Sequence, residues 1–162
     1  MSIRRTLVAL AAAAGLVLVG ASPAMAGGNP HFIKNATSAS IDGVSLVVEF
    51  KEAGLSSGAV ETIVVSADLE ALYQCVNGGG NVPSDPKKTV FDDRVSESGV
   101  FTAGQNGNLI GSLTLDPPDA DAVLDCPGGQ TSTLVSVIWS NVRIDDTTSG
   151  ASLSLRGVFT GP

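Results

Sequence analysis

Residues 60–76 decide the fold of this chain, and they read VETIVVSADLEALYQCV. The odd positions carry the residues that a protein core favours: Ile63, Val65, Ala67, Leu69, Ala71, Tyr73 and Cys75. Polar residues fill most of the even positions, and only a strand places such a period-two set on a single face. The stretch therefore predicts a half-buried strand. Because it is longer than a usual strand, we expect a bend near residues 67–69 or two strands in succession.

The same alternation continues on both sides of this stretch. Val44, Leu46, Val48 and Phe50 share one face of a strand over 44–50, and Asp42-Gly43 before it is a signal for a type I′ hairpin turn. Further strands are expected over residues 33–41, 88–96, 99–103, 108–115, 131–145 and 151–160. One short helical turn is expected at residues 119–124, and Trp139 is expected in the core.

About eight short strands without a convincing helix are typical of two sheets packed face to face. Alternation of apolar and polar residues means that each sheet buries one face in the core and exposes the other to solvent. We therefore expect an all-β fold, a single immunoglobulin-like β-sandwich of about eight mostly antiparallel strands. A closed β-barrel is the alternative.

Residues 1–26 have the features of a secretory signal peptide. Arg4 and Arg5 precede an apolar stretch from Leu7 to Val19, and small residues end the segment at Ala24-Met25-Ala26. Cleavage there would leave one secreted domain over residues 27–162, a normal size for a single core. The expected localisation is extracellular, and no second apolar stretch is long enough to span a membrane.

The expected mature chain is acidic, with 7 basic and 16 acidic residues and a net charge of −9. Nucleic acids and anionic membranes are bound by clusters of Lys and Arg, so this balance argues against both. We expect the partner to be an unidentified ligand or protein.

Cys75 and Cys126 are the two cysteines of the chain. An even number of cysteines in an oxidising compartment predicts a disulfide, and two cysteines allow a single pairing. The bridge would close a loop of roughly 50 residues, for which the loop-entropy model gives about 4 kcal/mol.

Residue types for catalysis are sparse. His31 is the single histidine and lies near the expected mature N-terminus, where a Ser-His-Asp site is not expected. We therefore expect no catalytic residues and no organic cofactor. Paired carboxylates such as Asp92-Asp93 and Asp145-Asp146 leave a carboxylate-based hydrolase as one alternative.

An acidic loop over residues 116–125 is the one candidate metal site. Asp116, Asp119, Asp121 and Asp125 lie within ten residues of each other, next to Cys126. Calcium takes six to eight oxygen ligands, and secreted modules often bind it weakly. The spacing is not that of an EF-hand, and Asp is also common in solvated loops.

Two segments carry a resemblance to known proteins. The first is Ala53-Gly54-Leu55-Ser56-Ser57-Gly58 with the strand that ends in Cys75. The second is Phe101-Thr102-Ala103 with Asn106-Gly107 and Ser112-Leu113-Thr114-Leu115. Both resemble small secreted all-β proteins of high-GC Gram-positive bacteria, including the neocarzinostatin-like chromophore carriers. That resemblance implies an immunoglobulin-like sandwich that shelters a small molecule in a cleft. The carriers have two disulfides, whereas this chain can form one, and no binding residue is transferred.

Taken together, the sequence favours a secreted, non-enzymatic β-sandwich that binds a ligand or partner or has a structural role. The alternatives are a chromophore-type carrier, a calcium-stabilised module and the carboxylate-based hydrolase.

Overall fold

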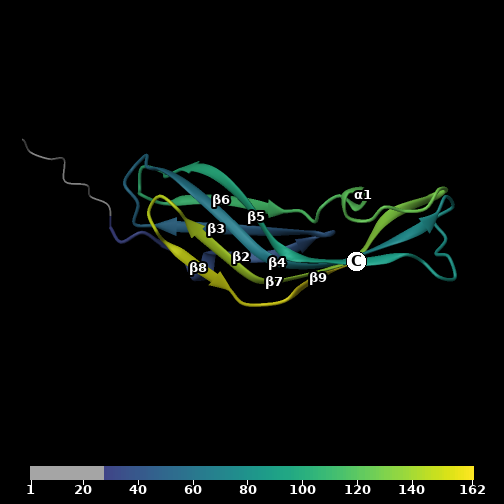
Figure 1. Cartoon of the computed structure of the whole chain (residues 1–162). Coiled ribbons are helices and arrows are strands. Elements are labelled where there is room, and N and C mark those ends of the chain that lie inside the picture. The colour runs from purple at the N-terminus through teal and green to yellow at the C-terminus, as the bar shows by residue number, and fades with distance from the viewer. Residues whose placement is uncertain (1–27) are drawn as a thin grey trace, which may run out of the picture.

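The computed structural model describes residues 28–162, and nearly all of its regular structure is β (Figure 1). The predicted signal peptide, residues 1–26, lies outside the described residues. In chain order the elements are β1 (His31–Phe32), the 3₁₀ turn η1 (Lys34–Ala36), β2 (Ser38–Asp42), β3 (Ser45–Ala53), β4 (Val60–Asn77), β5 (Lys88–Thr102), β6 (Leu109–Leu115), α1 (Ala120–Val123), β7 (Gln130–Asp146), β8 (Ser152–Leu155) and β9 (Phe159–Gly161).

The strands form two antiparallel sheets that pack against each other. In the first sheet β3 is central, with β6 on one side and the short strands β1 and β2 on the other. In the second sheet the order is β5-β4-β7, and β8 and β9 both pair with the free side of β7. The molecule is therefore a β-sandwich, as the sequence predicted, and the two sheets do not close into a barrel.

The core lies between the sheets and consists of the side chains that alternation placed there. All seven odd-numbered residues from Ile63 to Cys75 are buried, and Leu46, Val48 and Phe50 face them from β3. Trp139 is fully buried, and its indole Nε1–H donates to the carbonyl of Val44 across the sandwich at 3.0 Å. The prediction of Trp139 as a core residue is confirmed.

β4 is one continuous strand, so the predicted alternative of two strands in succession is wrong. The pairing of β4 with β7 is irregular between Ser66 and Asp68, at the place where the other alternative, a bend, was expected. Between the pairs Ser66–Arg143 and Asp68–Ser140, β7 holds two residues, Asn141 and Val142, where β4 holds one. An extra residue of this kind is a β-bulge, which bends the bulged strand and leaves the other regular.

Two turns can be compared directly with the predictions. Asp42 pairs with Ser45, so the hairpin loop is Gly43-Val44, one residue later than expected. Gly43 has φ 61°, and Val44 has no positive φ, which is the pattern of a type II′ turn. The helical turn expected at residues 119–124 is confirmed as α1.

Four predicted strand ranges are divided differently in the structure. Residues 33–41 contain η1 and most of β2 instead of one strand, while the ranges 88–96 and 99–103 belong to a single strand, β5. The range 151–160 is interrupted between β8 and β9, where Gly157 has φ 141°, a conformation that other residues rarely adopt.

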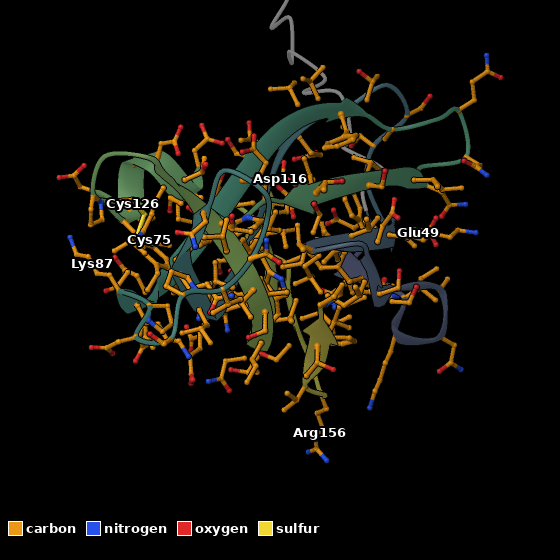
Figure 2. The ribbon with its side chains drawn as sticks, turned by 90° about the vertical axis from the view of Figure 1, so that its right-hand side faces the viewer. Glu49, Cys75, Lys87, Asp116, Cys126 and Arg156 are labelled. Carbon is orange, nitrogen blue, oxygen red and sulfur yellow. A yellow bond between two sulfur atoms is a disulfide. The ribbon has the colours of Figure 1, made fainter. Side chains whose placement is uncertain are left out.

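The two ends of the sandwich are closed differently. At one end the disulfide Cys75–Cys126 ties β4 to the loop that follows α1, with a Cα–Cα distance of 5.7 Å, so the predicted disulfide is confirmed (Figure 2). At the other end β3 finishes, β4 begins and β7 finishes, and three acidic side chains are buried there. Among residues 28–162 no helix has the length and apolar character that crossing a membrane requires.

Candidate functional site

The outer face of the second sheet contains a polar network centred on the β7 bulge. Asn141 has φ 51°, which is the left-handed conformation that Asn tolerates better than most residues. Its side-chain amide donates to Asp68 Oδ2 at 2.7 Å. The bulge thus turns both the side-chain amide and the backbone carbonyl of Asn141 toward the neighbouring strands.

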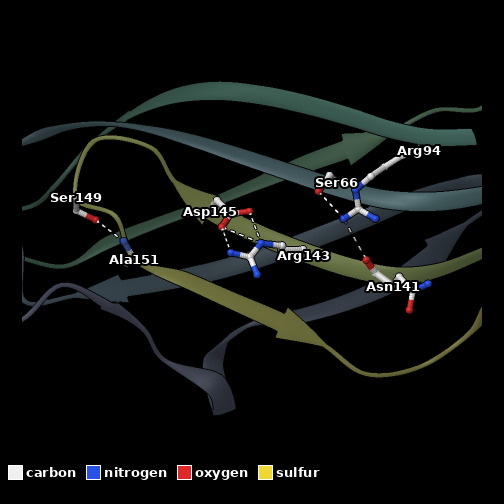
Figure 3. Close-up of polar contacts among 7 residues, drawn as sticks. All are labelled: Ser66, Arg94, Asn141, Arg143, Asp145, Ser149 and Ala151. Atoms are coloured by element: carbon white, nitrogen blue, oxygen red, sulfur yellow. Dashed lines mark hydrogen bonds and ion pairs between the residues drawn. The ribbon is translucent and has the colours of Figure 1, made fainter.

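Arg94 joins this network from β5. Its register partner on β4 is Asp68, and its guanidinium donates to Asp68 Oδ1 at 2.5 Å. The same group donates to Ser66 Oγ at 2.8 Å and to the carbonyl of Asn141 at 3.3 Å (Figure 3). Hydrogen bonds from Asn141 and then Arg94 lower the pKa of Asp68 below its ordinary value. Four side chains on three strands therefore hold one another in place.

Arg143 lies just beyond the bulge and is held by Asp145, two residues along the same strand. Arg143 Nε donates to the carboxylate at 2.8 Å and Nη2 donates at 2.6 Å, a two-point contact that fixes the guanidinium plane (Figure 3). Two ion pairs form among residues 28–162, Arg94–Asp68 and Arg143–Asp145. Both arginines therefore lie in defined orientations on the same sheet.

Arg156 follows β8 in the exposed segment that leads to β9. Its side chain extends away from the sandwich (Figure 2), and it belongs to neither ion pair of the described residues. All five of its N–H groups can therefore donate to a ligand.

These three arginines line one open cleft of about 440 Å³ between β7 and the end of β8. Asn141, Ser154 and Gly157 add further polar and backbone surface to its wall. A second depression of about 370 Å³ lies beside it and shares Ser154, Leu155 and Arg156, with Lys34 on its far wall. Four of the seven basic residues in 27–162 thus border one region of an acidic chain.

The charges of this arginine cleft do not cancel. Asp68 and Asp145 balance two of the three guanidinium groups, so the group as a whole keeps one net positive charge. Each paired guanidinium also retains N–H donors that its carboxylate does not use. Such a site offers fixed donors to an anion, and arginine is suited to planar or tetrahedral oxyanions such as carboxylate and phosphate.

The four aspartates proposed for calcium lie elsewhere. Asp116, Asp119, Asp121 and Asp125 are all exposed along the loop around α1. Asp116 accepts a hydrogen bond from Ser45 at 2.5 Å, while the backbone carbonyl of Asp125 accepts one from Lys87 at 2.6 Å. In the described part of the chain, no group of three or more acidic, histidine or cysteine side chains is arranged to hold a metal ion.

The sequence did not predict the arginine cleft. Arg94, Arg143 and Arg156 are far apart in the chain, and their meeting depends on strand order, register and the bulge at Asn141. The available signal was compositional, since the expected mature chain has three arginines against four lysines and all three arginines lie on predicted strands. His31, the histidine considered as a base, is exposed and contacts the carbonyl of Asn29 at 2.7 Å.

Comparison with known proteins adds no further constraint to this site. No protein-family model, no curated protein and no solved structure matches the chain. The function of the arginine cleft must therefore be inferred from its geometry and charge.

Proposed function

We propose that this protein is a secreted, non-enzymatic, immunoglobulin-like β-sandwich that binds a small anionic ligand, a carboxylate or phosphate compound, in the arginine cleft. The observation that carries the proposal is that Arg94, Arg143 and Arg156 all line one cleft, although residues 27–162 have a net charge of −9. The features of residues 1–26 and the disulfide support export into an oxidising compartment.

The size and rigidity of the cleft favour a small ligand. Its volume of about 440 Å³ lies in the range of small-molecule sites, roughly 300–1,000 Å³. Asp68 and Asp145 hold two of the guanidinium groups in place before a ligand arrives, which reduces the entropy lost on binding. A polyanion would meet the negative field of the whole molecule, so a compact anion is favoured.

Binding is a better description than catalysis for these residues. Arginine does not lose its proton in proteins, so it orients and neutralises an anion but does not act as a general base. Asn141 and Ser154 add hydrogen-bonding groups of the same kind. The proposed role is therefore capture of an anion and not its conversion.

Isothermal titration with inorganic phosphate and with citrate tests this function. We expect wild-type protein to bind at least one of them, Arg156→Gln to weaken binding by about tenfold or more, and added salt to weaken it further. Lys51→Gln is the matched control, because it removes the same charge from the outer face of the other sheet and should leave the affinity within about twofold. Equal losses in the two variants would contradict a specific site and indicate a general charge effect.

A further inference from the structure

Three acidic side chains are buried together at the end of the sandwich opposite the disulfide. Glu52 of β3 is 0% exposed, Glu61 of β4 is 5% exposed and Asp146 of β7 is 1% exposed. They come from both sheets, so their carboxyl groups meet across the interior. One oxygen of each, Glu52 Oε2, Glu61 Oε2 and Asp146 Oδ2, has no hydrogen-bond donor from the rest of the protein.

Asp146 is the centre of this carboxyl cluster. The carboxyl groups of Glu52 and Glu61 both lie within hydrogen-bonding reach of the Asp146 carboxyl group. Two carboxyl groups can share a hydrogen bond when one of them carries a proton, and two adjacent carboxylates repel. A proton bound to Glu52 or Glu61 can therefore be shared in a hydrogen bond with the neighbouring Asp146 carboxyl group.

The surroundings supply no compensating positive charge. On β1 and β6 the register partners of Glu52 are Phe32 and Leu109, which are buried and apolar. The charged groups that face it are Glu61 from β4 and Asp146 from β7, and both are acidic. His31 on β1 is exposed and turned to Asn29, and neither ion pair within residues 28–162 involves this cluster.

The cluster also anchors the turn between β7 and β8, residues 147–151. Ser149 Oγ donates to Glu52 Oε1 at 3.1 Å and accepts the amide of Ala151 at 3.2 Å. The Thr148 amide donates to Asp146 Oδ1 at 2.8 Å. The Ser149 bond by itself favours ionised Glu52, and the turn is also bonded to Thr62 of β4. The link between the turn and the proton therefore comes from the burial of Glu52 and its repulsion by Asp146 while the turn is closed.

We propose that Glu52, Glu61 and Asp146 form a proton-operated latch, in which a bound proton holds the 147–151 turn against β3 and loss of that proton releases the turn. The latch does not depend on the arginine cleft, because its residues lie inside the sandwich and share none of the cleft's contacts.

The direction of the pH effect is set by the surroundings of Glu52. Burial, followed by the nearby Asp146 carboxylate, raises the pKa of Glu52 from 4.5 to about 7, and the same causes raise the pKa of Glu61. An acid with a raised pKa stabilises the folded state fully when the pH is below its unfolded-state pKa of 4.5. This stabilisation is lost as the pH rises toward the folded-state pKa of about 7. Between these limits the folding equilibrium constant should fall about tenfold per pH unit, about 300-fold in all.

Denaturant unfolding between pH 4.5 and pH 8 of the wild type and Glu52→Gln tests the latch. Glutamine keeps the shape and can donate to Asp146 as the protonated acid does, so the variant should lose the extra pH dependence of the wild type. Glu49→Gln is the matched control, since Glu49 is exposed on the opposite face of the same strand and its removal changes the net charge equally. Parallel pH profiles for wild type and Glu52→Gln would overturn the proposal.

Two measurements on the wild type give independent tests. The carboxyl ¹³C resonance of Glu52 should titrate near pH 7, and a midpoint near 4.5 would overturn the latch. Above that pH the amides of Thr148 and Ala151 should lose protection from hydrogen exchange, after correction for the intrinsic rate. If calcium chloride stabilises the wild type at pH 8 but not Glu52→Gln, the cluster binds a cation instead of a proton, which also overturns the proposal.

Discussion

Asn141 is the one non-glycine residue among 28–162 with a positive φ, and it organises the arginine cleft. Its conformation allows the β7 bulge, its amide orients Asp68, and its carbonyl accepts from Arg94. The left-handed conformation costs a non-glycine residue roughly 1 kcal/mol, which Asn partly offsets through local hydrogen bonds. The geometry of the cleft thus depends on this one side chain.

Replacement of Asn141 separates the backbone effect from the side-chain effect. Asn141→Ala should destabilise the fold by about 1–2 kcal/mol, because Ala is strained at this φ and loses the bond to Asp68. Asn141→Gly removes the same bond but accepts the conformation, so its loss should be smaller. Urea unfolding at pH 7 measures both, and a glycine variant less stable than the alanine variant would contradict the explanation.

At the scale of single residues, the sequence predicted the features that depend only on alternation and composition. Trp139 in the core and the Cys75–Cys126 bond are of this kind. The buried acids had a signal that was missed: Glu52 continues the even-numbered face that ends in Phe50, and Glu61 precedes the odd-numbered face that begins at Ile63. The role of Asn141 had no signal in the sequence. The register shift at Asn141 arises between two strands that are distant in the chain.

At the scale of elements, β6 illustrates how closely the two sheets approach. Gly111 faces the interior, where Phe50 and Phe101 pack edge to face with ring centroids 5.1 Å apart. A Cβ atom at this position would lie 2.5 Å from Phe101 Cε1 and 2.8 Å from Phe50 Cζ. Only glycine allows the aromatic pair to cover the strand at this point.

Gly111→Ala should therefore destabilise the sandwich. Overpacking of this kind costs about 1–3 kcal/mol, because both rings must move from their preferred positions. Gly128→Ala is the control, since a Cβ there meets nothing within 4 Å. Thermal unfolding of the two variants measures the difference, and equal melting temperatures would show that the rings adapt freely.

Most strands could be predicted from the sequence, because alternation of apolar and polar residues is a local property. The residues at which the strands begin and end could not. β1 and β2 both pair with β3, and β8 and β9 both pair with β7, so each pair fills one edge of a sheet in two pieces. Where one piece ends is set by the partner strand and by residues such as Gly157. Strand order and bulges likewise depend on contacts that the local pattern does not contain.

At the scale of the whole molecule, two open depressions on opposite sheets differ in the charge of their walls, and this difference affects which ligands they can bind. One of them, about 470 Å³, lies on the outer face of the first sheet and includes Glu49, Lys51 and the 74% exposed Ile110 in its wall. Charged and apolar groups are mixed there, while the arginine cleft on the opposite sheet is dominated by cations. The charge contrast between the two faces favours the arginine cleft for an anion, and the chromophore-type carrier stays a prediction from resemblance.

The disulfide and the carboxyl cluster close opposite ends of the sandwich, so removing one should leave the other intact. The Cys75–Cys126 bond spans 51 residues and restrains the segment from β5 to α1 in the unfolded chain. The loop-entropy model gives about 4 kcal/mol for a loop of this length, so Cys75→Ala/Cys126→Ala should lower the free energy of unfolding by about that amount.

Urea unfolding of this double variant at several pH values shows whether the disulfide stabilises only its own end of the sandwich or also affects the carboxyl cluster. Because the carboxyl cluster is not touched, the variant should keep the same fall in stability between pH 4.5 and pH 7 as the wild type. Additivity is expected for features so far apart that they share no partner. A pH dependence that disappears together with the disulfide would mean that the two ends are coupled through the long strand β4, which runs between them.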